Sequence, residues 1–144
     1  MSVCTFFGHR DCPDCLRPRL REAVEGLIRE AGVDTFYVGN QGQFDAMALG
    51  VLRELSQVYP HIRYGVVLAY LPQGEAEPEA MFPEGLEKVP PRYAISRRNS
   101  WMLRRADFVV TYIAHPWGGT AGFGQKAERL GKQIISLAPD PNRQ

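Results

Sequence analysis

A regular alternation of two patterns constrains the fold of this chain more than any other feature. Short apolar runs rich in β-branched and aromatic residues, typical of buried strands, alternate with longer segments in which apolar residues recur at helical spacing. The apolar runs cover residues 3–7, 35–38, 64–71, 108–114 and 133–137. Strands that alternate with helices pair in parallel through right-handed crossovers. The sequence therefore predicts an α/β fold, a three-layer Rossmann-like sandwich with a five-stranded, mainly parallel sheet.

Helix signals fill the segments between these strands. Pro18 suits the first turn of the first helix, Gly32 lies just past its end, and Pro60 stops the second helix. The apolar positions with helical spacing fall within residues 20–28, 44–59, 93–106 and 121–130. Residues 73–91 are rich in glycine, glutamate and proline, which predicts an irregular excursion or flap there.

Composition excludes several other classes of protein. With 144 residues, of which 44% are hydrophobic and 23% charged, the chain can bury a core and is not of the disordered type. Its net charge of +1 means that any basic patch is local. No apolar run approaches the ~20 residues of a membrane span, and three cysteines suit a reducing compartment. We therefore expect one domain over residues 1–144 in the cytoplasm, with no membrane contact, cofactor or metal.

Three glycine-rich segments follow predicted strands. They read Gly-His-Arg at 8–10, Gly-Asn-Gln-Gly at 39–42 and Pro-Trp-Gly-Gly-Thr at 116–120. Ligands of open parallel sheets bind beyond the carboxyl ends of the strands, and a glycine-rich turn that opens a helix presents N–H groups to phosphate. Each glycine alone is equally explained by a tight strand-to-helix turn. Three such turns at one edge of the sheet favour a ligand site.

Several segments, in order along nearly the whole chain, resemble the SLOG superfamily, which joins DprA/Smf-type proteins to the LOG nucleotide hydrolases. The shared segments are Phe-Phe-Gly-His-Arg at 6–10, Tyr-Val-Gly-Asn-x-Gly-x-Phe-Asp at 37–45, Val-Val-Leu-Ala-Tyr-Leu-Pro at 66–72, Arg-Asn-x-Trp-Met at 98–102 and Gly-Gly at 118–119. The likeness is strongest to small bacterial members. It implies a Rossmann-like fold, a nucleotide-like ligand and a homodimer.

The likeness to LOG proteins extends to a pattern that contains Arg98. That family has an arginine four residues before a methionine, ahead of an Ala-Asp pair and a strand, and here Arg98, Met102 and residues 106–107 match this pattern. The family then has Pro-Gly-Gly-x-Gly-Thr-x-x-Glu, in which the glycines and threonine hold phosphate and the glutamate assists loss of the base. Gly118 and Gly119 match the glycine pair.

The rest of the LOG catalytic motif departs from the family. Trp117 stands for the proline, Ala121 and Gly122 replace the Gly-Thr pair, and Gln125 falls at the place of the catalytic glutamate. Cleavage of an N-glycosidic bond needs a carboxylate that activates water or stabilises positive charge, and glutamine cannot supply one. The first hypothesis is therefore binding of a nucleotide or nucleotide-derived phosphorylated metabolite, with a sensor role as one form of this function.

In this hypothesis phosphate rests on residues 118–120 and Arg98, while base and ribose lie toward the first two turns. The candidate ligand-binding residues are Gly8, His9, Arg10, Gly39, Asn40, Gly42, Arg98, Trp117, Gly118, Gly119 and Thr120. The alternative hypothesis is a hydrolase of a nucleotide N-glycosidic bond with Asp45 as its catalytic carboxylate.

Each candidate side chain also has a structural explanation. Asp45 falls in the first turn of a helix, where the dipole favours a carboxylate, and Asn40 can hold its own turn. A single arginine is commonly a solvated surface group, and His9 can be a hydrogen-bonded loop residue as well as a proton donor. Trp117 can stack on a base or ribose.

Two further motifs stand outside this site. Cys12 and Cys15 form a Cys-x-x-Cys pair near a helix start, where a lowered thiol pKa and redox chemistry, or zinc binding with His9, are the alternatives to a chance motif. The segment from Lys88 to Arg105 is basic and contains Tyr93 and Trp101, so it is either a solvated helix face or a weaker candidate for single-stranded nucleic acid.

Overall fold

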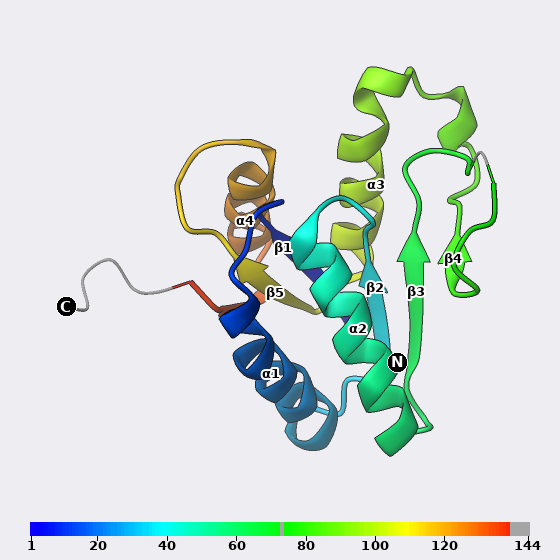
Figure 1. Ribbon diagram of the computed structural model, residues 1–144. Coiled ribbons are helices and arrows are strands. Elements are labelled where there is room, and N and C mark those ends of the chain that lie inside the picture. The colour runs from blue at the N-terminus through cyan, green and yellow to red at the C-terminus, as the bar shows by residue number, and fades with distance from the viewer. Residues whose placement is uncertain (73, 139–144) are drawn as a thin grey trace.

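The computed structural model describes residues 1–72 and 74–138 of the chain (Figure 1). Its centre is a six-stranded sheet in the order β4-β3-β2-β1-β5-β6, and every neighbouring pair is parallel. The strands are β1 (Val3–Gly8), β2 (Thr35–Val38), β3 (Arg63–Val67), β4 (Ala80–Met81), β5 (Phe108–Tyr112) and β6 (Gln133–Ser136). The predicted α/β sandwich with a parallel sheet is confirmed.

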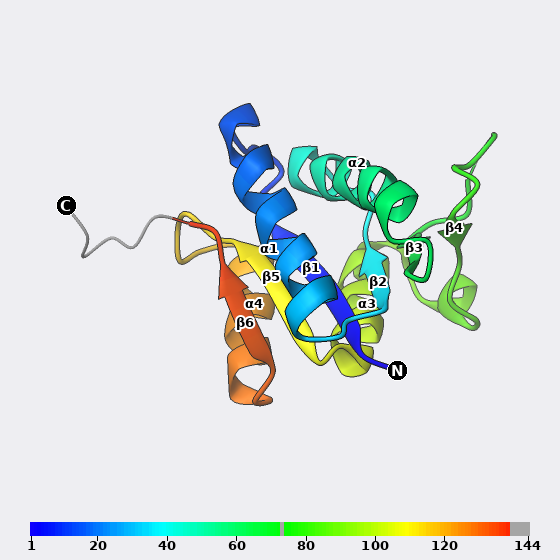
Figure 2. The same ribbon diagram turned by 90° about the horizontal axis from the view of Figure 1, so that it is seen from below.

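Four helices cover the two faces of the sheet and complete the three layers. They are α1 (Arg17–Glu30), α2 (Gln43–Val58), α3 (Pro91–Arg105) and α4 (Gly119–Arg129). Figure 2 shows α1 and α2 together on one face and α3 and α4 on the other. Two short 3-10 helices, η1 (Asp14–Leu16) and η2 (Leu86–Lys88), precede α1 and α3.

The core is divided by the sheet, because successive side chains of a strand point to opposite faces. In β1, Phe6 packs with Phe36 and Phe44 in the cluster under α1 and α2. Its neighbour Phe7 packs with Met102 in the cluster under α3 and α4. Both phenylalanines are buried, so β1 has no face in contact with solvent.

The sheet has six strands, and the prediction of five was wrong. The additional strand β4 lies inside the segment 73–91 that was predicted to be irregular, and it pairs Ala80 and Met81 with Val66 and Val67 of β3. A two-residue strand is too short to give an alternating pattern. Its pairing is supplied by the free edge of β3, which no local sequence signal reports.

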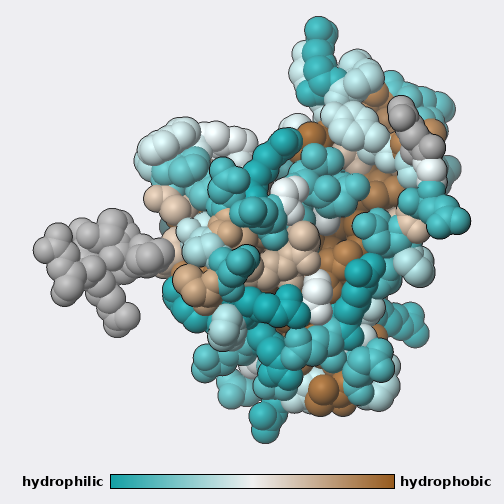
Figure 3. All heavy atoms as spheres, in the orientation of Figure 1, coloured by the Kyte–Doolittle hydropathy of each residue, from teal (hydrophilic) through white to brown (hydrophobic). Residues whose placement is uncertain are grey.

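The strand order identifies where ligands bind in such folds. The chain moves from β1 outward through β2, β3 and β4, and then returns to place β5 on the other side of β1. The order of the strands therefore reverses between β1 and β5, and the crevice beyond their carboxyl ends is the usual ligand position. In the space-filling view, hydrophilic residues cover most of the visible face (Figure 3). No helix among the described residues has the length and apolarity to cross a membrane.

Candidate functional site

A cavity of about 400 Å³ lies at the switch point, and we call it the charged cavity. Its wall is formed by the end of β1 with the turn that follows it, the turn after β2 with the start of α2, the part of α3 from Arg92 to Met102, and the start of α4. The polar residues of that wall are Arg10, Gln41, Asp45, Arg92, Ser96, Arg98, Asn99 and Thr120. Phe6, Phe7, Ile95, Met102 and Phe123 form its apolar part.

Arg98 is a buried cation, with 2% of its surface exposed. Its Nη1 donates to the carbonyl of Val67 at 3.0 Å and to Oδ1 of Asn40 at 3.3 Å, and its Nε donates to Oδ1 of Asn99 at 2.8 Å. All three acceptors are neutral. Within residues 1–72 and 74–138, no carboxylate lies within 4.0 Å of this guanidinium. Burial lowers the pKa of Arg98, and nearby Asp45 partly opposes that shift.

Asp45 is a buried carboxylate on the same cavity wall, in the first turn of α2. Its Oδ2 accepts a hydrogen bond from the backbone N–H of Gln41 at 2.9 Å. Burial raises the pKa of Asp45 to about 6, although that hydrogen bond and the positive charges of Arg98 and Arg10 act in the opposite direction. Near neutral pH this side chain can therefore both accept and release a proton.

The turns after β1 and β2 are tightly packed against this charged cavity. A Cβ on Gly8, the last residue of β1, would collide with the ring of Phe44, and one on Gly39 would lie 2.8 Å from Oδ2 of Asp45 and 2.9 Å from Nη1 of Arg98. Gly42, the N-cap of α2, has a φ of +97°, and its Cβ would lie 2.6 Å from Cα of Arg10. Packing within the protein therefore explains why glycine occupies these three positions.

The turn after β5 is open instead. Gly118 caps the N-terminus of α4 with a φ of +96°, and a Cβ on Gly118 or Gly119 would meet no atom within 4 Å. The first N–H groups of a helix have no partner within the helix and carry its positive dipole end. Oγ1 of Thr120 donates to the carbonyl of Gly8 at 3.4 Å, which joins this turn to the end of β1. The start of α4 therefore presents free donors to the cavity.

A second hollow of about 440 Å³ lies beside the first, and we call it the aromatic groove. Three rings stack along it: His9 on His115 with centroids 3.7 Å apart, and His115 on Trp117 with centroids 4.0 Å apart. Trp117 is 66% exposed. The charged cavity and the aromatic groove share Arg10, Gly119 and Thr120 as lining residues.

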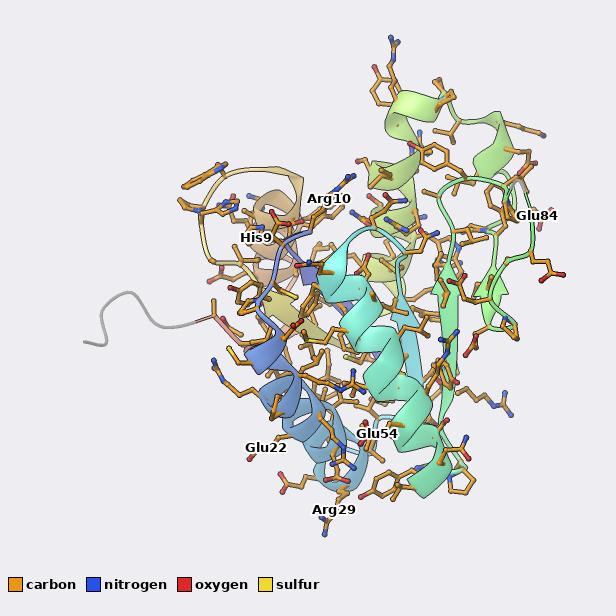
Figure 4. The ribbon with its side chains drawn as sticks, viewed as in Figure 1. His9, Arg10, Glu22, Arg29, Glu54 and Glu84 are labelled. Atoms are coloured by element: carbon orange, nitrogen blue, oxygen red, sulfur yellow. The ribbon has the colours of Figure 1, made fainter. Side chains whose placement is uncertain are left out.

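His9 holds the loop that follows β5. Its Nε2 accepts the backbone N–H of Ala114 at 2.9 Å and that of His115 at 3.4 Å. Burial, followed by the neighbouring His115, lowers the pKa of His9, which favours the neutral ring that these two hydrogen bonds require. Figure 4 shows His9 and Arg10 beyond the end of β1, with His9 toward the loop after β5 and Arg10 toward α3.

The predicted residues come together at one edge of the sheet. Gly8, Arg10, Asp45, Arg98, Gly119 and Thr120 line the charged cavity, and His9, Trp117 and Gly118 line the aromatic groove with the shared residues. Gly39, Asn40 and Gly42 stand behind the cavity wall, in contact with Arg98, Asp45 or Arg10. Gln125, at the place of the LOG glutamate, lines neither hollow and instead faces a separate one beside β6.

Sequence reasoning missed the part of α3 that faces the charged cavity. Arg92, Ile95, Asn99 and Met102 recur every three or four residues and all line it. The signal was present, because this spacing places residues on one face of a helix. This face of α3 mixes polar and apolar side chains, and such a face is hard to recognise because a stripe that packs in the core is expected to be apolar.

Two other sequence motifs are the Cys-x-x-Cys pair and the basic segment 88–105. The cysteine pair lies outside the charged cavity, and only part of the basic segment lines it. Cys12 is buried, Cys15 is exposed, and both are free. Burial, with nearby Asp14 and Asp11, raises the pKa of Cys12, which is opposite to the lowered pKa of the redox alternative. No group of three metal-ligating side chains occurs in the described part of the chain. In the basic segment, Arg92 and Arg98 face the cavity, whereas Arg104 and Arg105 are exposed.

Comparison with known proteins shows a likeness in fold to a solved structure. No protein-family model matches the chain, and no curated protein matches it. The fold is similar to the X-ray structure of DNA processing protein A (DprA) from Streptococcus pneumoniae, with a TM-score of 0.72 and 13% sequence identity. The match covers 99% of this chain and 52% of that one, so this chain spans about half of the DprA length. The DprA-like Rossmann-like fold implied by the sequence is thereby confirmed.

Proposed function

We propose that this protein binds a nucleotide or a nucleotide-derived phosphorylated metabolite in the charged cavity. The observation that carries the proposal is Arg98, a buried cation on the cavity wall with no counter-ion within 4.0 Å among the described residues. A buried charge that has no close counter-ion is costly to a fold, even where neutral groups accept its hydrogen bonds. A phosphate group supplies such a counter-ion, because the planar guanidinium pairs with two phosphate oxygens.

The second support for the proposal is the turn at the start of α4. Gly119 lines the charged cavity, yet no atom of a neighbouring segment among the described residues lies within 4 Å of the place that a Cβ at this position would take. Its backbone N–H, with that of Thr120, belongs to the unpaired first turn of the helix. An anion placed between Arg98 and these N–H groups satisfies both at once.

Isothermal titration calorimetry with AMP, ADP and inorganic phosphate tests this function, after native mass spectrometry of the freshly purified protein. We expect Arg98→Met, which keeps an unbranched side chain, to weaken nucleotide affinity by at least about tenfold through the lost charge-assisted hydrogen bonds. The matched control is Arg104→Met, an exposed arginine of the same helix that lines neither hollow.

Two outcomes would contradict the proposal. One is the absence of any phosphorylated ligand both in the purified protein and in the titrations. The other is equal affinity of Arg98→Met and Arg104→Met, with both variants folded by circular dichroism. Gly119→Ala provides a second variant in case Arg98→Met fails to fold, because its added methyl group enters open space.

A second candidate function rests on Asp45. A carboxyl group with a pKa of about 6 in a ligand-sized cavity has the property of a general acid or base at neutral pH. Hydrolysis of a nucleotide N-glycosidic bond would use Asp45 to activate water, while the C1′–N bond breaks and the base leaves with a proton. Release of free base from AMP by the wild type, and none by Asp45→Asn, supports it. No release by the wild type refutes it.

A further inference from the structure

The candidate site has two compartments of similar size, and they differ in chemistry. The charged cavity measures about 400 Å³ and contains Asp45 and Arg98, whereas the aromatic groove measures about 440 Å³ and contains the ring stack of His9, His115 and Trp117. Each volume is at the lower end of the range of about 300–1,000 Å³ for small-molecule pockets. A ligand that fills only one compartment therefore leaves the other without an occupant.

The junction between the compartments is the turn that favours phosphate. Arg10, Gly119 and Thr120 line both hollows, so the free N–H groups at the start of α4 lie at the boundary. Arg98 lies inside the charged cavity. Two linked phosphates that run from Gly119 toward Arg98 would thus meet two sets of donors: the N–H groups at the start of α4 and the guanidinium of Arg98.

The two ends of the ligand are distinguished by the groups that meet them. The exposed ring of Trp117, backed by His115 and His9, is a flat surface on which a nucleobase stacks. Asp45 is buried in the wall of the charged cavity. Within the described residues its carboxylate accepts one hydrogen bond, from the backbone N–H of Gln41 to Oδ2 at 2.9 Å. A second carboxylate oxygen is therefore left for hydroxyl donors, such as those of a sugar.

We propose that the ligand is a nucleoside diphosphate carrying a sugar on its second phosphate. Its base lies on Trp117 in the aromatic groove, its diphosphate crosses the junction at Gly119, and its terminal sugar contacts Asp45 in the charged cavity. This inference rests on the proposed function, since it assigns the parts of a ligand to that same site. Linking the two ends in one molecule avoids a second loss of translational freedom, so affinity rises above that of either part.

Titration calorimetry with ADP-ribose, ADP and ribose 5-phosphate tests the assignment. We expect ADP-ribose to bind at least about tenfold more tightly than either of the other two compounds. Asp45→Asn removes the preference for ADP-ribose over ADP, because the terminal sugar loses its charged acceptor. Trp117→Ala lowers the affinity for ADP-ribose by about tenfold and keeps the preference over ADP.

The controls are Glu30→Gln at the exposed end of α1 and Leu130→Ala at the far end of α4, neither of which lines the two compartments. Thermal unfolding checks that each variant folds. Equal affinity of the wild type for ADP-ribose and ADP overturns the two-ended ligand and leaves the proposed function standing. An equal loss of preference in Trp117→Ala and Asp45→Asn overturns the assignment of the ends. Absence of binding to all three compounds overturns both proposals.

Discussion

Glycine is frequent in two regions at the carboxyl edge of the sheet: the ends of β1 and β2 with the turns after them, and the turn after β5. The physical reason for glycine differs between these two regions. At Gly8, Gly39 and Gly42 a side chain would collide with Phe44, with Asp45 and Arg98, or with Arg10. At Gly118 and Gly119 a side chain would meet nothing within 4 Å. The first region is shaped by its own packing, whereas the second is left open at the end of a helix.

The packed turns position the charged side chains of the site, whereas the open turn is placed to contact the ligand itself. The packed turns fix the positions of Asp45 and Arg98, because any added volume at Gly39 would push these two charged groups apart. The open turn positions only its own backbone donors. Side chains added in the packed region should therefore lower the free energy of unfolding through collisions, while side chains added in the open region cause no such collision and should act on ligand affinity.

The largest expected effect on stability is that of Gly8→Ala. Its Cβ would collide with the ring of the buried Phe44, so we expect a loss of about 3 kcal/mol in the free energy of unfolding, at the upper end for overpacking. Urea unfolding measures it. The control is Gly26→Ala in α1, where the added Cβ meets nothing and a small gain is expected. If Gly8→Ala lost less stability than a typical surface substitution, the contrast between packed and open glycine positions would be wrong.

Gly42→Ala and Gly118→Ala form a matched pair that isolates packing from backbone strain. Their φ angles are +97° and +96°, so the strain of an L-residue in this region is the same at both positions. Only Gly42 has a neighbour, Cα of Arg10 at 2.6 Å from the added Cβ. We expect Gly42→Ala to be less stable than Gly118→Ala by about 2 kcal/mol, again by urea unfolding. Equal losses would show that both turns are governed by φ alone.

The charge held by the packed turns gives stability a pH dependence. Because burial raises the pKa of Asp45 to about 6, the folded state holds this proton more tightly than the unfolded state, whose pKa is near 3.8. Stability is lowest above pH 6 and rises as the pH falls through 6 toward 4. Between pH 7.5 and pH 5 we expect a gain of about 1 kcal/mol from this group. Asp45→Asn should remove that gain, and an unchanged pH profile in this variant would contradict the assignment.

The smallest expected effect on stability is that of Gly119→Ala. The added methyl group meets no protein atom, and alanine is favoured over glycine in a helix, so stability should rise by no more than about 1 kcal/mol. The same methyl group enters the space where phosphate approaches, and AMP affinity should fall by about tenfold. Thermal unfolding and calorimetry on one sample separate the two. Unaltered AMP affinity would mean that the open turn does not contact the ligand.

The sequence predicted the fold class and the edge of the sheet where the candidate residues meet, but not how each residue is used. Asp45 was recognisable as a first-turn carboxylate, whereas its burial depends on the packing of the turn after β2 against α3. The role of Gly8 was not predictable, because Phe44 lies 36 positions away in the chain. The strand β4 was missed since its pairing comes from β3 and not from its own two residues.

Alternation of apolar runs and helical stripes by itself determined a parallel α/β sandwich, because burial on both faces of a sheet requires that pattern. The sequence also determined that three glycine-rich turns lie at the carboxyl edge of the sheet. Only the tertiary structure decided which of these turns is filled and which is open, and that Arg98 is buried with no carboxylate within 4.0 Å in the described part of the chain. These properties depend on distances between segments far apart in the chain, and such distances exist only after the layers have packed.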